Sequence, residues 1–223
     1  MNDLLTRYPG LPLAVLPLGT ENLLATSLRI PTSGRAMARI VATGTERRFD
    51  VGLIGQRRFV MCAGVGLDAA IIQAVHNSRT GHITKWSYAW PILRLFLTYR
   101  PEELVLRDES GAEHRGRQIL IVNQPRYAMG LSWAPDAAGD DGWLDVRVFV
   151  QSSLPWLAWY LWRAWCGVRG RQSGVIHLRV RRATITSVQP APVHVDGDPA
   201  GVTPIEVEVL PGNLTLLLPP LPT

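Results

Sequence analysis

Alternation of apolar and polar residues dominates the chain from residue 45 onward. Residues 49–54 alternate, Gly55-Gln56 forms a turn, and residues 58–62 alternate back, which predicts a hairpin. Turn residues punctuate the following segments at regular spacing, which is typical of a β-sandwich or a β-barrel. Further strands are predicted at 103–108, 117–123, 143–150, 175–187, 192–196, 205–209 and 213–218.

The N-terminal part shows a different pattern, a short apolar strand at 13–16 followed by helical periodicity. One helix is predicted at about 20–28, with Thr20 as its cap, and a second at about 34–42. One strand and two helices cannot close a core. We therefore expect a small α/β piece at residues 1–44 beside a mainly β domain at 45–223, with inserted helices at about 67–76 and 84–98.

One segment carries four tryptophans at successive i+3 steps, Trp156, Trp159, Trp162 and Trp165. Such steps place the rings on a slowly drifting stripe of one helix. Tryptophan favours the boundary between water and an apolar phase, which makes membrane contact one interpretation. Packing of the stripe against the sheet is the other, and the sequence leaves both open.

Composition and charge narrow the class of protein. Hydrophobic residues make up 47% and charged residues 18%, which indicates a folded globular chain. The longest uncharged stretch, 148–162, contains Gln151 and Pro155 and falls short of the roughly 20 apolar residues that cross a membrane. Cys62 and Cys166 form no disulfide framework, and no signal peptide precedes them, so a cytoplasmic location is expected.

The net charge of +5 is concentrated in residues 1–100, where 12 basic residues face 5 acidic ones. The arginine doublets at 47–48, 57–58 and 181–182 lie on strand-like segments. Nucleic-acid binding favours a clustered basic stripe interleaved with aromatic residues. We therefore expect no nucleic-acid partner.

Two glycine-containing turns are candidates for phosphate binding. In Pro17-Leu-Gly-Thr-Glu-Asn22 a hydroxyl and free backbone N–H groups stand at a helix start, where a phosphate can bind. Gly64-Val-Gly66-Leu-Asp68-Ala69 has the form of a dinucleotide fingerprint. No acidic residue lies between Asp68 and Glu102, so this second turn is interpreted as structural, with Asp68 capping a helix.

Two acidic segments are candidates for metal binding and catalysis. The turn from Asp136 to Asp145 offers carboxylates and carbonyls for one hard cation, or is simply a solvated turn. Asp196-Gly-Asp198 is either a plain hairpin turn or a catalytic base with a second carboxylate beside it. Local sequence does not decide between these interpretations.

Taken in order, these segments resemble the diacylglycerol kinase and sphingosine kinase superfamily, nearest to its bacterial lipid kinases. The family's P-L-G-T-x-N-D/E-x-A motif is similar to Pro17–Ala25, and its G-x-G-x-D-A motif to Gly64–Ala69. Its D-G-x-L-D-V region is similar to Asp141–Val146 and its D-G-E motif to Asp196–Asp198. The resemblance extends over about residues 11–218.

The resemblance implies a two-domain fold, with an incomplete Rossmann-like nucleotide domain at 1–44 and a β-sandwich domain at 45–223. It also implies ATP-dependent phosphorylation of the hydroxyl of a diacylglycerol-like or sphingoid lipid. The protein would act as a peripheral protein at the inner face of the cytoplasmic membrane. Whether it forms a homodimer stays open. The matching positions imply three sets of site residues. Gly19, Thr20 and Asn22 would bind ATP, and Asp141 with the backbone of Ala138 and Trp143 would bind a structural Mg²⁺. Asp198 would be the proton acceptor, helped by Asp196.

Three positions depart from the family pattern. The family's G-G-D-G-T phosphate loop precedes the P-L-G-T turn and is absent from these 223 residues, Leu23 replaces an acid, and Asp198 replaces Glu. Phosphoryl transfer depends on positioning and charge stabilisation around the phosphates. Three hypotheses therefore stay open: a lipid kinase whose reading frame starts upstream, a non-catalytic lipid- or partner-binding β module, and an NAD-kinase-like enzyme acting on a soluble substrate.

Overall fold

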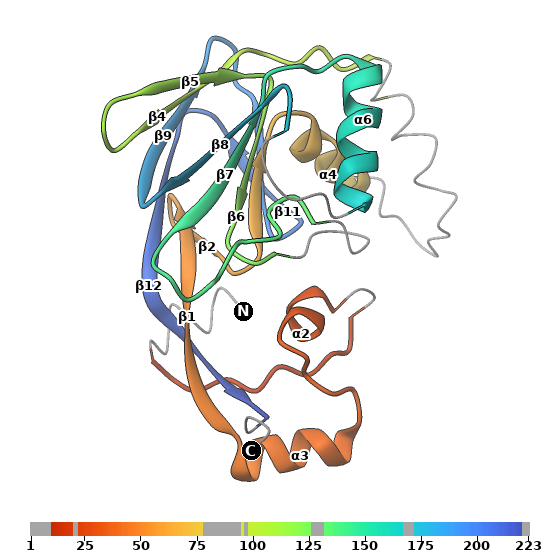
Figure 1. Cartoon of the computed structure of the whole chain (residues 1–223), viewed down its shortest axis with the longest axis vertical. Helices are drawn as coiled ribbons and strands as arrows, with labels where there is room; N and C mark the ends of the chain where they lie inside the picture. The colour runs from red at the N-terminus through yellow and green to blue at the C-terminus, as the bar shows by residue number, and fades with distance from the viewer. Residues whose placement is uncertain are drawn as a thin grey trace.

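Two six-stranded antiparallel sheets dominate the computed structural model, which describes residues 10–19, 22–77, 95, 98–125, 132–166 and 172–219 (Figure 1). The first sheet has the strand order β2-β1-β12-β9-β4-β5 and the second β11-β10-β3-β6-β7-β8. The strands are β1 (Thr45–Ile54), β2 (Arg57–Phe59), β3 (Cys62–Val65), β4 (Leu104–Asp108), β5 (Glu113–Gly116), β6 (Gln118–Val122), β7 (Leu144–Phe149), β8 (Val175–Val180), β9 (Arg182–Ser187), β10 (Pro192–Val195), β11 (Asp198–Val202) and β12 (Ile205–Leu218). The helices are α2 (Leu23–Ser27), α3 (Gly34–Thr43), α4 (Leu67–Asn77) and α6 (Leu154–Trp165).

The main core lies between the two sheets. Inward-facing side chains of both sheets fill it, among them the fully buried Leu104, Ile119 and Ile185. Strands β3 and β7 are buried at every position. Helix α6 packs over the outer face of the second sheet through Tyr160 and Phe149, so β7 is covered on both sides.

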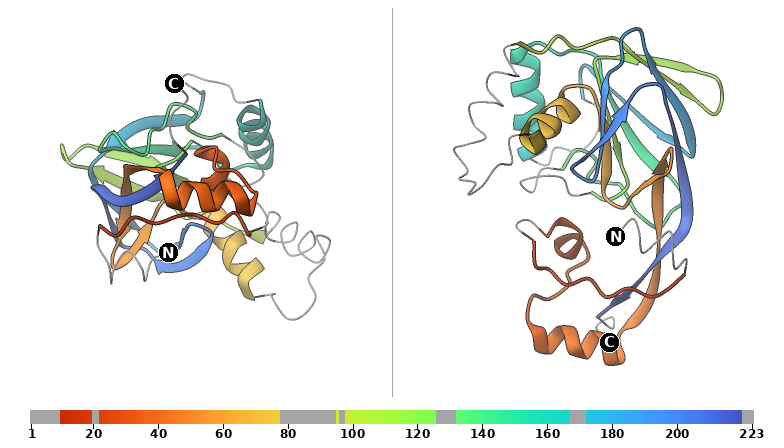
Figure 2. Two further views of the ribbon diagram at one scale, coloured as in Figure 1. Left: turned by 90° about the horizontal axis from the view of Figure 1, so that it is seen from below. Right: turned by 180° about the vertical axis from the view of Figure 1, so that it is seen from behind.

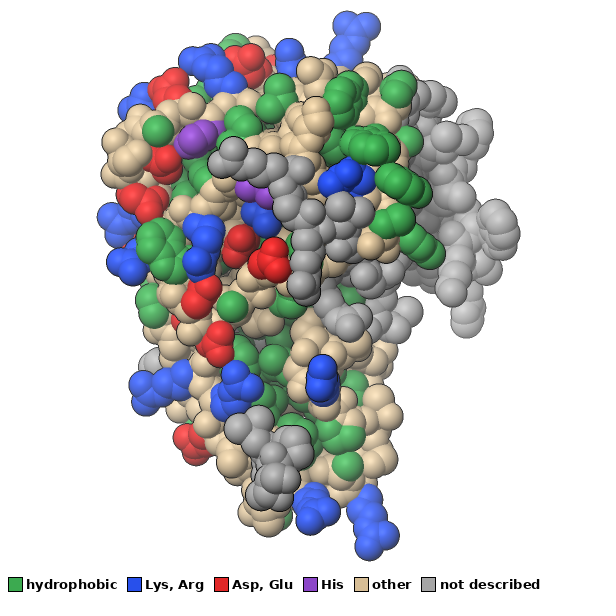
Figure 3. Space-filling model, in the orientation of Figure 1, with side chains coloured by type: hydrophobic (Ala, Val, Ile, Leu, Met, Phe, Trp, Pro, Cys, Tyr) green, Lys and Arg blue, Asp and Glu red, His purple; other side chains and the backbone are tan. Residues whose placement is uncertain are grey.

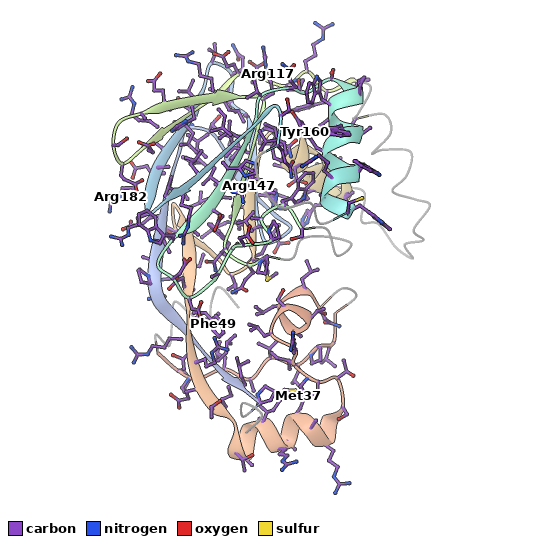
Figure 4. The ribbon with its side chains drawn as sticks, viewed as in Figure 1. Met37, Phe49, Arg117, Arg147, Tyr160 and Arg182 are labelled. Atoms are coloured by element: carbon purple, nitrogen blue, oxygen red, sulfur yellow. The ribbon has the colours of Figure 1, made fainter. Side chains whose placement is uncertain are left out.

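Strands β1 and β12 extend beyond the sandwich as a long two-stranded ribbon, paired from Thr45 with Leu218 to Ile54 with Val207 (Figure 2). A second core forms where α2 and α3 pack on this β1–β12 ribbon, and Figure 4 shows Met37 and Phe49 within it. The segment at residue 13 adds a short parallel pairing to β12. The N-terminal α/β piece is therefore built on strands that also belong to the sandwich sheet, and the boundary after residue 44 stays a prediction.

Most of the predicted elements are present. The hairpin of β1 and β2, the helix α4 and the β-sandwich class are confirmed. Helix α2 begins at Leu23 with Asn22 as its N-cap, later than expected. The helix predicted at 84–98 lies outside the described residues, except for positions 95 and 98.

Two strand predictions were wrong in their boundaries. The expected strand at 175–187 is divided at Arg181 into β8 and β9, which belong to different sheets, so the chain crosses the sandwich there. The expected strands at 205–209 and 213–218 form the single strand β12. Within the described ranges, no helix has the length and apolar character needed to cross a bilayer.

Candidate active site

The turn between β10 and β11 is a tight two-residue hairpin. Val195 pairs with Asp198, and the two residues between them, Asp196 and Gly197, have φ values of 47° and 86°. Positive φ at both central positions defines a type I′ turn, for which Asp-Gly is a favoured sequence. The plain-turn interpretation of Asp196-Gly197 is thus correct for the backbone.

The carboxylate of Asp196 anchors this hairpin. It accepts backbone N–H groups from Val60, Met61 and Cys62 at 2.8, 2.9 and 3.0 Å, although the residue as a whole lies at the surface. Burial of the carboxylate raises the pKa of Asp196, and the three N–H donors and His194 oppose that rise. The three bonds fix the β10–β11 turn to the link between β2 and β3.

Asp198 has a different environment although it lies two residues further on. It is the first residue of β11 and is exposed, and within the described ranges no hydrogen bond or ion pair engages its carboxylate. The hairpin therefore presents one bound carboxylate and one free carboxylate. The free one can accept a proton from a substrate.

A buried histidine beside the hairpin holds it to helix α4. His194 of β10 is fully buried, and its Nε2 lies 2.6 Å from Oδ2 of Asp68 in the first turn of α4. Nδ1 of His194 has no partner among the described residues, so the tautomer with the proton on Nε2 is the one that donates to Asp68. A Cβ at Gly64 would lie 2.7 Å from the same Asp68 oxygen, which explains a glycine in this strand.

A second buried aspartate connects the hairpin region with the acidic turn. Oδ2 of Asp50 accepts the N–H of Gly142 at 2.6 Å, and Oδ1 accepts the N–H of Gly212 at 2.8 Å. The Asn123 side chain donates to the carbonyls of both Asp50 and Val60, at 2.9 and 2.8 Å. Since Val60 also donates to Asp196, a continuous set of hydrogen bonds runs from the acidic turn to the β10–β11 hairpin.

The acidic turn places Asp141 next to a basic side chain. One oxygen of Asp141 accepts the N–H of Trp143 at 3.1 Å, and the other contacts the Arg179 guanidinium. Arg179 also lies 3.9 Å from the carboxylate of Asp145, whose burial raises its pKa. Arg179 thus lies beside both carboxylates, and Asp145 also has the Arg147 guanidinium at 3.5 Å.

The donor set of this turn fits a hard cation in its chemistry. The predicted ligands are the carboxylate of Asp141 and the backbone carbonyls of Ala138 and Trp143, and a hard cation prefers such oxygen donors. Asp50 fixes the turn through Gly142. Arg179 now compensates the charge of Asp141, so a cation would compete with it. No cluster of three or more His, Cys, Asp or Glu side chains suited to a metal occurs in the part of the chain that the structure describes.

The turn predicted to bind ATP is described only in part. Gly19 donates its N–H to the Asn22 side chain at 2.7 Å, and the Asn22 amide donates back to the Gly19 carbonyl at 2.8 Å. Asn22 itself has φ 47°, in the left-handed region. These two bonds join residues 19 and 22 to each other, while Thr20 lies outside the described residues.

Two family models match this chain. The one described as YegS C-terminal NAD kinase beta sandwich-like domain matches residues 61–218, and the one described as Diacylglycerol kinase catalytic domain matches residues 1–54. The chain belongs to the YegS-type lipid-kinase family.

Known proteins of similar sequence and structure agree with this assignment. An uncharacterized protein of Synechocystis sp. is 24% identical over 219 residues, covering 94% of this chain and 50% of that protein. The diacylglycerol kinase of Bacillus subtilis is 23% identical over 213 residues, covering 93% of this chain and 69% of the enzyme. A crystal structure from Bacillus anthracis has a TM-score of 0.75 at 19% identity, covering 98% of this chain and 72% of that one. The chain thus spans about half the length of the Synechocystis relative.

In this YegS-type chain the structure joins residues that the sequence indicated separately. Asp196 and Asp198 share one hairpin, and a bridge through Asp50 links that hairpin to the turn of Asp141. The roles of Asp50, Asn123 and His194 were not predicted. A polar residue between buried neighbours in a strand was the available signal, in Phe49-Asp-Val51 and in Val193-His-Val195.

Proposed function

We propose that this chain takes part in the ATP-dependent phosphorylation of a lipid hydroxyl, with Asp198 as the proton acceptor. Membership of the YegS-type lipid-kinase family supports the reaction class. One observation carries the residue assignment: the β10–β11 hairpin is fixed through Asp196 while the carboxylate of Asp198 stays exposed.

In the proposed reaction the lipid hydroxyl oxygen attacks the γ-phosphorus of ATP. A bond forms between that oxygen and phosphorus, the bond from phosphorus to the β,γ-bridging oxygen breaks, and ADP leaves with the bond's electron pair. The hydroxyl proton passes to the Asp198 carboxylate. Asp is shorter than the family's Glu by one C–C bond, about 1.5 Å, so the hydroxyl lies closer or one water relays the proton.

Asp196 acts in this proposal as a positioning residue. Its carboxylate is occupied by three backbone N–H groups, so its contribution is to hold the turn that carries Asp198. His194 and Asp68 support the same hairpin from α4. A general base works only within hydrogen-bond reach of its proton, so a fixed hairpin favours turnover.

The nucleotide end of the site is proposed at Gly19, Thr20 and Asn22. Two hydrogen bonds join Gly19 and Asn22, which flank Thr20 in the sequence, and this local order supports a nucleotide contact here. The 223 residues hold no Gly-Gly-Asp-Gly-Thr sequence to supply further N–H donors to the phosphates. We therefore expect efficient transfer only from a protein in which such a loop precedes Met1.

A divalent cation, Mg²⁺ in the family, is proposed at Asp141 with the carbonyls of Ala138 and Trp143. When bound, it supplies positive charge that holds this turn in place. Asp50 joins this turn to β12, because its carboxylate accepts the N–H groups of both Gly142 and Gly212. The chemistry of transfer is assigned to Asp198 and not to this turn.

The acceptor class is tested by following phosphate from radiolabelled ATP. The 223-residue chain, and a version in which a segment with the family's phosphate loop precedes Met1, are incubated with Mg²⁺ and micelles of dioleoylglycerol or sphingosine, or with soluble NAD. We expect label in a lipid product of the extended version. Label in NAD alone favours the NAD-kinase-like alternative, and no labelled product in any arm favours a non-catalytic β module.

A further inference from the structure

Helix α6 presents three tryptophan side chains to solvent. Trp159, Trp162 and Trp165 are 41%, 55% and 76% exposed, and the rings of Trp159 and Trp162 stack at 5.2 Å. Figure 3 shows hydrophobic side chains gathered over α6 around one basic side chain. We call Trp159, Trp162 and Trp165 the tryptophan face.

The four-tryptophan stripe is divided by helix geometry. Each i+3 step turns about 60° back around the axis, so the stripe drifts from one side of the helix to the other. Trp156 packs beside Tyr160, with ring centroids 5.7 Å apart, and belongs to the core under α6. Tyr160 is buried, lies between α6 and the sheet, and donates its hydroxyl to the carbonyl of Gly174 at 3.0 Å (Figure 4). The core-packing interpretation thus holds for Trp156, whereas the other three tryptophans are exposed.

The packing of α6 does not require the tryptophan face. Tyr160, Ala164 and Trp156 bury the inner side of the helix against the second sheet. Trp162 and Trp165 are more than half exposed, so these two rings contribute little to the stability of the fold. An exposed apolar cluster of this kind typically marks an interaction site.

The charge around the helix favours an anionic partner. Residues 151–171 contain three arginines and no acidic residue. One of them, Arg163, lies on α6 with its guanidinium 5.5 Å from the ring of Trp159. Tryptophan rings with neighbouring arginines and no acids are the combination that binds the headgroup region of an anionic bilayer.

The helix also begins beside an open apolar depression. Pro155, Trp156, Trp159 and Ser173 line a groove of about 290 Å³ at its N-terminal end. Figures 1 and 2 place α6 on the same side of the sandwich as α2 and α4. The groove and the tryptophan face are continuous through Trp159.

We propose that α6 is the membrane-docking element of this protein, lying in the headgroup region of an anionic bilayer with its tryptophan face inserted and Arg163 at the phosphates. The proposal rests on the proposed function in one respect, that the substrate is a membrane lipid. It goes beyond that function by assigning the docking surface to particular residues outside the β10–β11 hairpin.

Vesicle binding tests the docking surface directly. The full chain is sedimented with vesicles of phosphatidylcholine alone or with phosphatidylglycerol at one part in three. We expect binding to the anionic vesicles that weakens as salt is added, with a blue shift of tryptophan emission. The double variant Trp162→Ala/Trp165→Ala is expected to lower partitioning at least about tenfold, because interfacial binding scales with the apolar area inserted.

Two further variants control for folding and for general hydrophobicity. Trp162→Phe/Trp165→Phe keeps aromatic area and should retain most of the binding. Val41→Ala/Val188→Ala removes two exposed apolar side chains elsewhere, 60% and 87% exposed, and should bind like the unaltered chain. Unchanged melting temperatures exclude loss of fold as the cause.

The outcomes separate docking from catalysis. Equal vesicle binding by the Trp162→Ala/Trp165→Ala variant overturns the proposal, as does a dimer that dissociates in this variant while vesicle binding persists. In the version with the phosphate loop, the variant should phosphorylate a dispersed short-chain diacylglycerol normally and lose activity only on vesicles. Tryptophan-dependent vesicle binding without phosphorylation of any lipid would leave docking standing and refute the proposed function.

Discussion

The imidazole of His194 and the carboxylate of Asp68 meet at 2.6 Å across 126 positions of the sequence. The contact joins β10, two residues before the Asp196 turn, to the first turn of α4. His194 is fully buried, so little water competes for this bond. The pair therefore fixes the hairpin of the candidate site to a helix that covers its sandwich sheet.

Gly64→Ala tests the importance of this contact. A Cβ at position 64 meets His194 and lies 2.7 Å from Oδ2 of Asp68, so the two side chains must separate. We expect the free energy of unfolding to fall by about 1–3 kcal/mol, the usual cost of crowding a packed interior. Urea denaturation measures the change.

Gly34→Ala serves as the matched control. Gly34 is the first residue of α3, and a Cβ there meets nothing within 4 Å. Alanine is the better helix former, so stability should be unchanged or slightly higher. Equal losses in the two alanine variants would show that the Asp68–His194 contact is not what Gly64 protects.

Asp196→Ala is expected to destabilise the fold through lost hydrogen bonds. Three backbone N–H groups lose their charged acceptor at once, which should cost about 2–3 kcal/mol. For a chain of this size that corresponds to a fall in melting temperature of roughly 4–12 °C. Asp198→Ala, which removes a carboxylate with no described partner, should leave the melting temperature within about 1–2 °C. Similar losses for both variants would contradict the division of roles on the hairpin.

Cation binding at the acidic turn should be sensitive to Arg179. Because Arg179 contacts Asp141 and lies 3.9 Å from Asp145, its removal frees negative charge for a metal ion. Arg179→Gln is expected to tighten Mg²⁺ binding at least several-fold in calorimetric titrations, and Asp141→Asn to abolish it. Mg²⁺ affinity that neither substitution changes would place the cation elsewhere. Chelator should lower the melting temperature of the Arg179→Gln variant more than that of the unaltered chain, because Arg179 compensates the charge of Asp141 once the ion is removed.

ATP affinity of the 223-residue chain should be weak. Gly19 and Asn22 are the described residues of the proposed nucleotide site, and the 223 residues contain no Gly-Gly-Asp-Gly-Thr sequence. Backbone N–H groups of glycine-rich loops supply most phosphate contacts in such sites. Calorimetry should give a dissociation constant in the millimolar range for Mg-ATP. Micromolar affinity would show that another part of this chain binds the phosphates.

The local sequence pattern predicts most strands and helices of this protein. It fails where pairing with a distant strand determines the boundaries of a strand. Alternation continues through Arg181, so the sequence indicates one strand where the chain in fact passes from one sheet to the other. Pro211-Gly212 has the composition of a turn but forms a bulge in β12, opposite Asp50, where the pairing with β1 shifts register. In both places the partner strand is distant in sequence.

In the candidate site, too, local features were predictable from the sequence and long-range contacts were not. The Asp196-Gly197 pair predicts a tight turn locally, and the proposed role of Asp198 comes from the resemblance of Asp196–Asp198 to the family's D-G-E motif. The bonds of Asp50 to Gly142 and Gly212 span 92 and 162 positions, so no local pattern reveals them. A charged or polar residue between two buried strand neighbours was the single local sign that Asp50 and His194 have specific partners.

Turnover of the Asp198→Asn variant tests the central claim most directly. In the version that carries the phosphate loop before Met1, a positioned base contributes roughly 10²–10⁴-fold, so the variant should lose that factor in the rate of lipid phosphorylation. ATP affinity and melting temperature should be unchanged, because no described side chain contacts this carboxylate, and Asp198→Glu should keep substantial activity. A loss of less than about tenfold in the Asn variant would mean that Asp196-Gly197-Asp198 is only a turn and that the proton acceptor lies elsewhere.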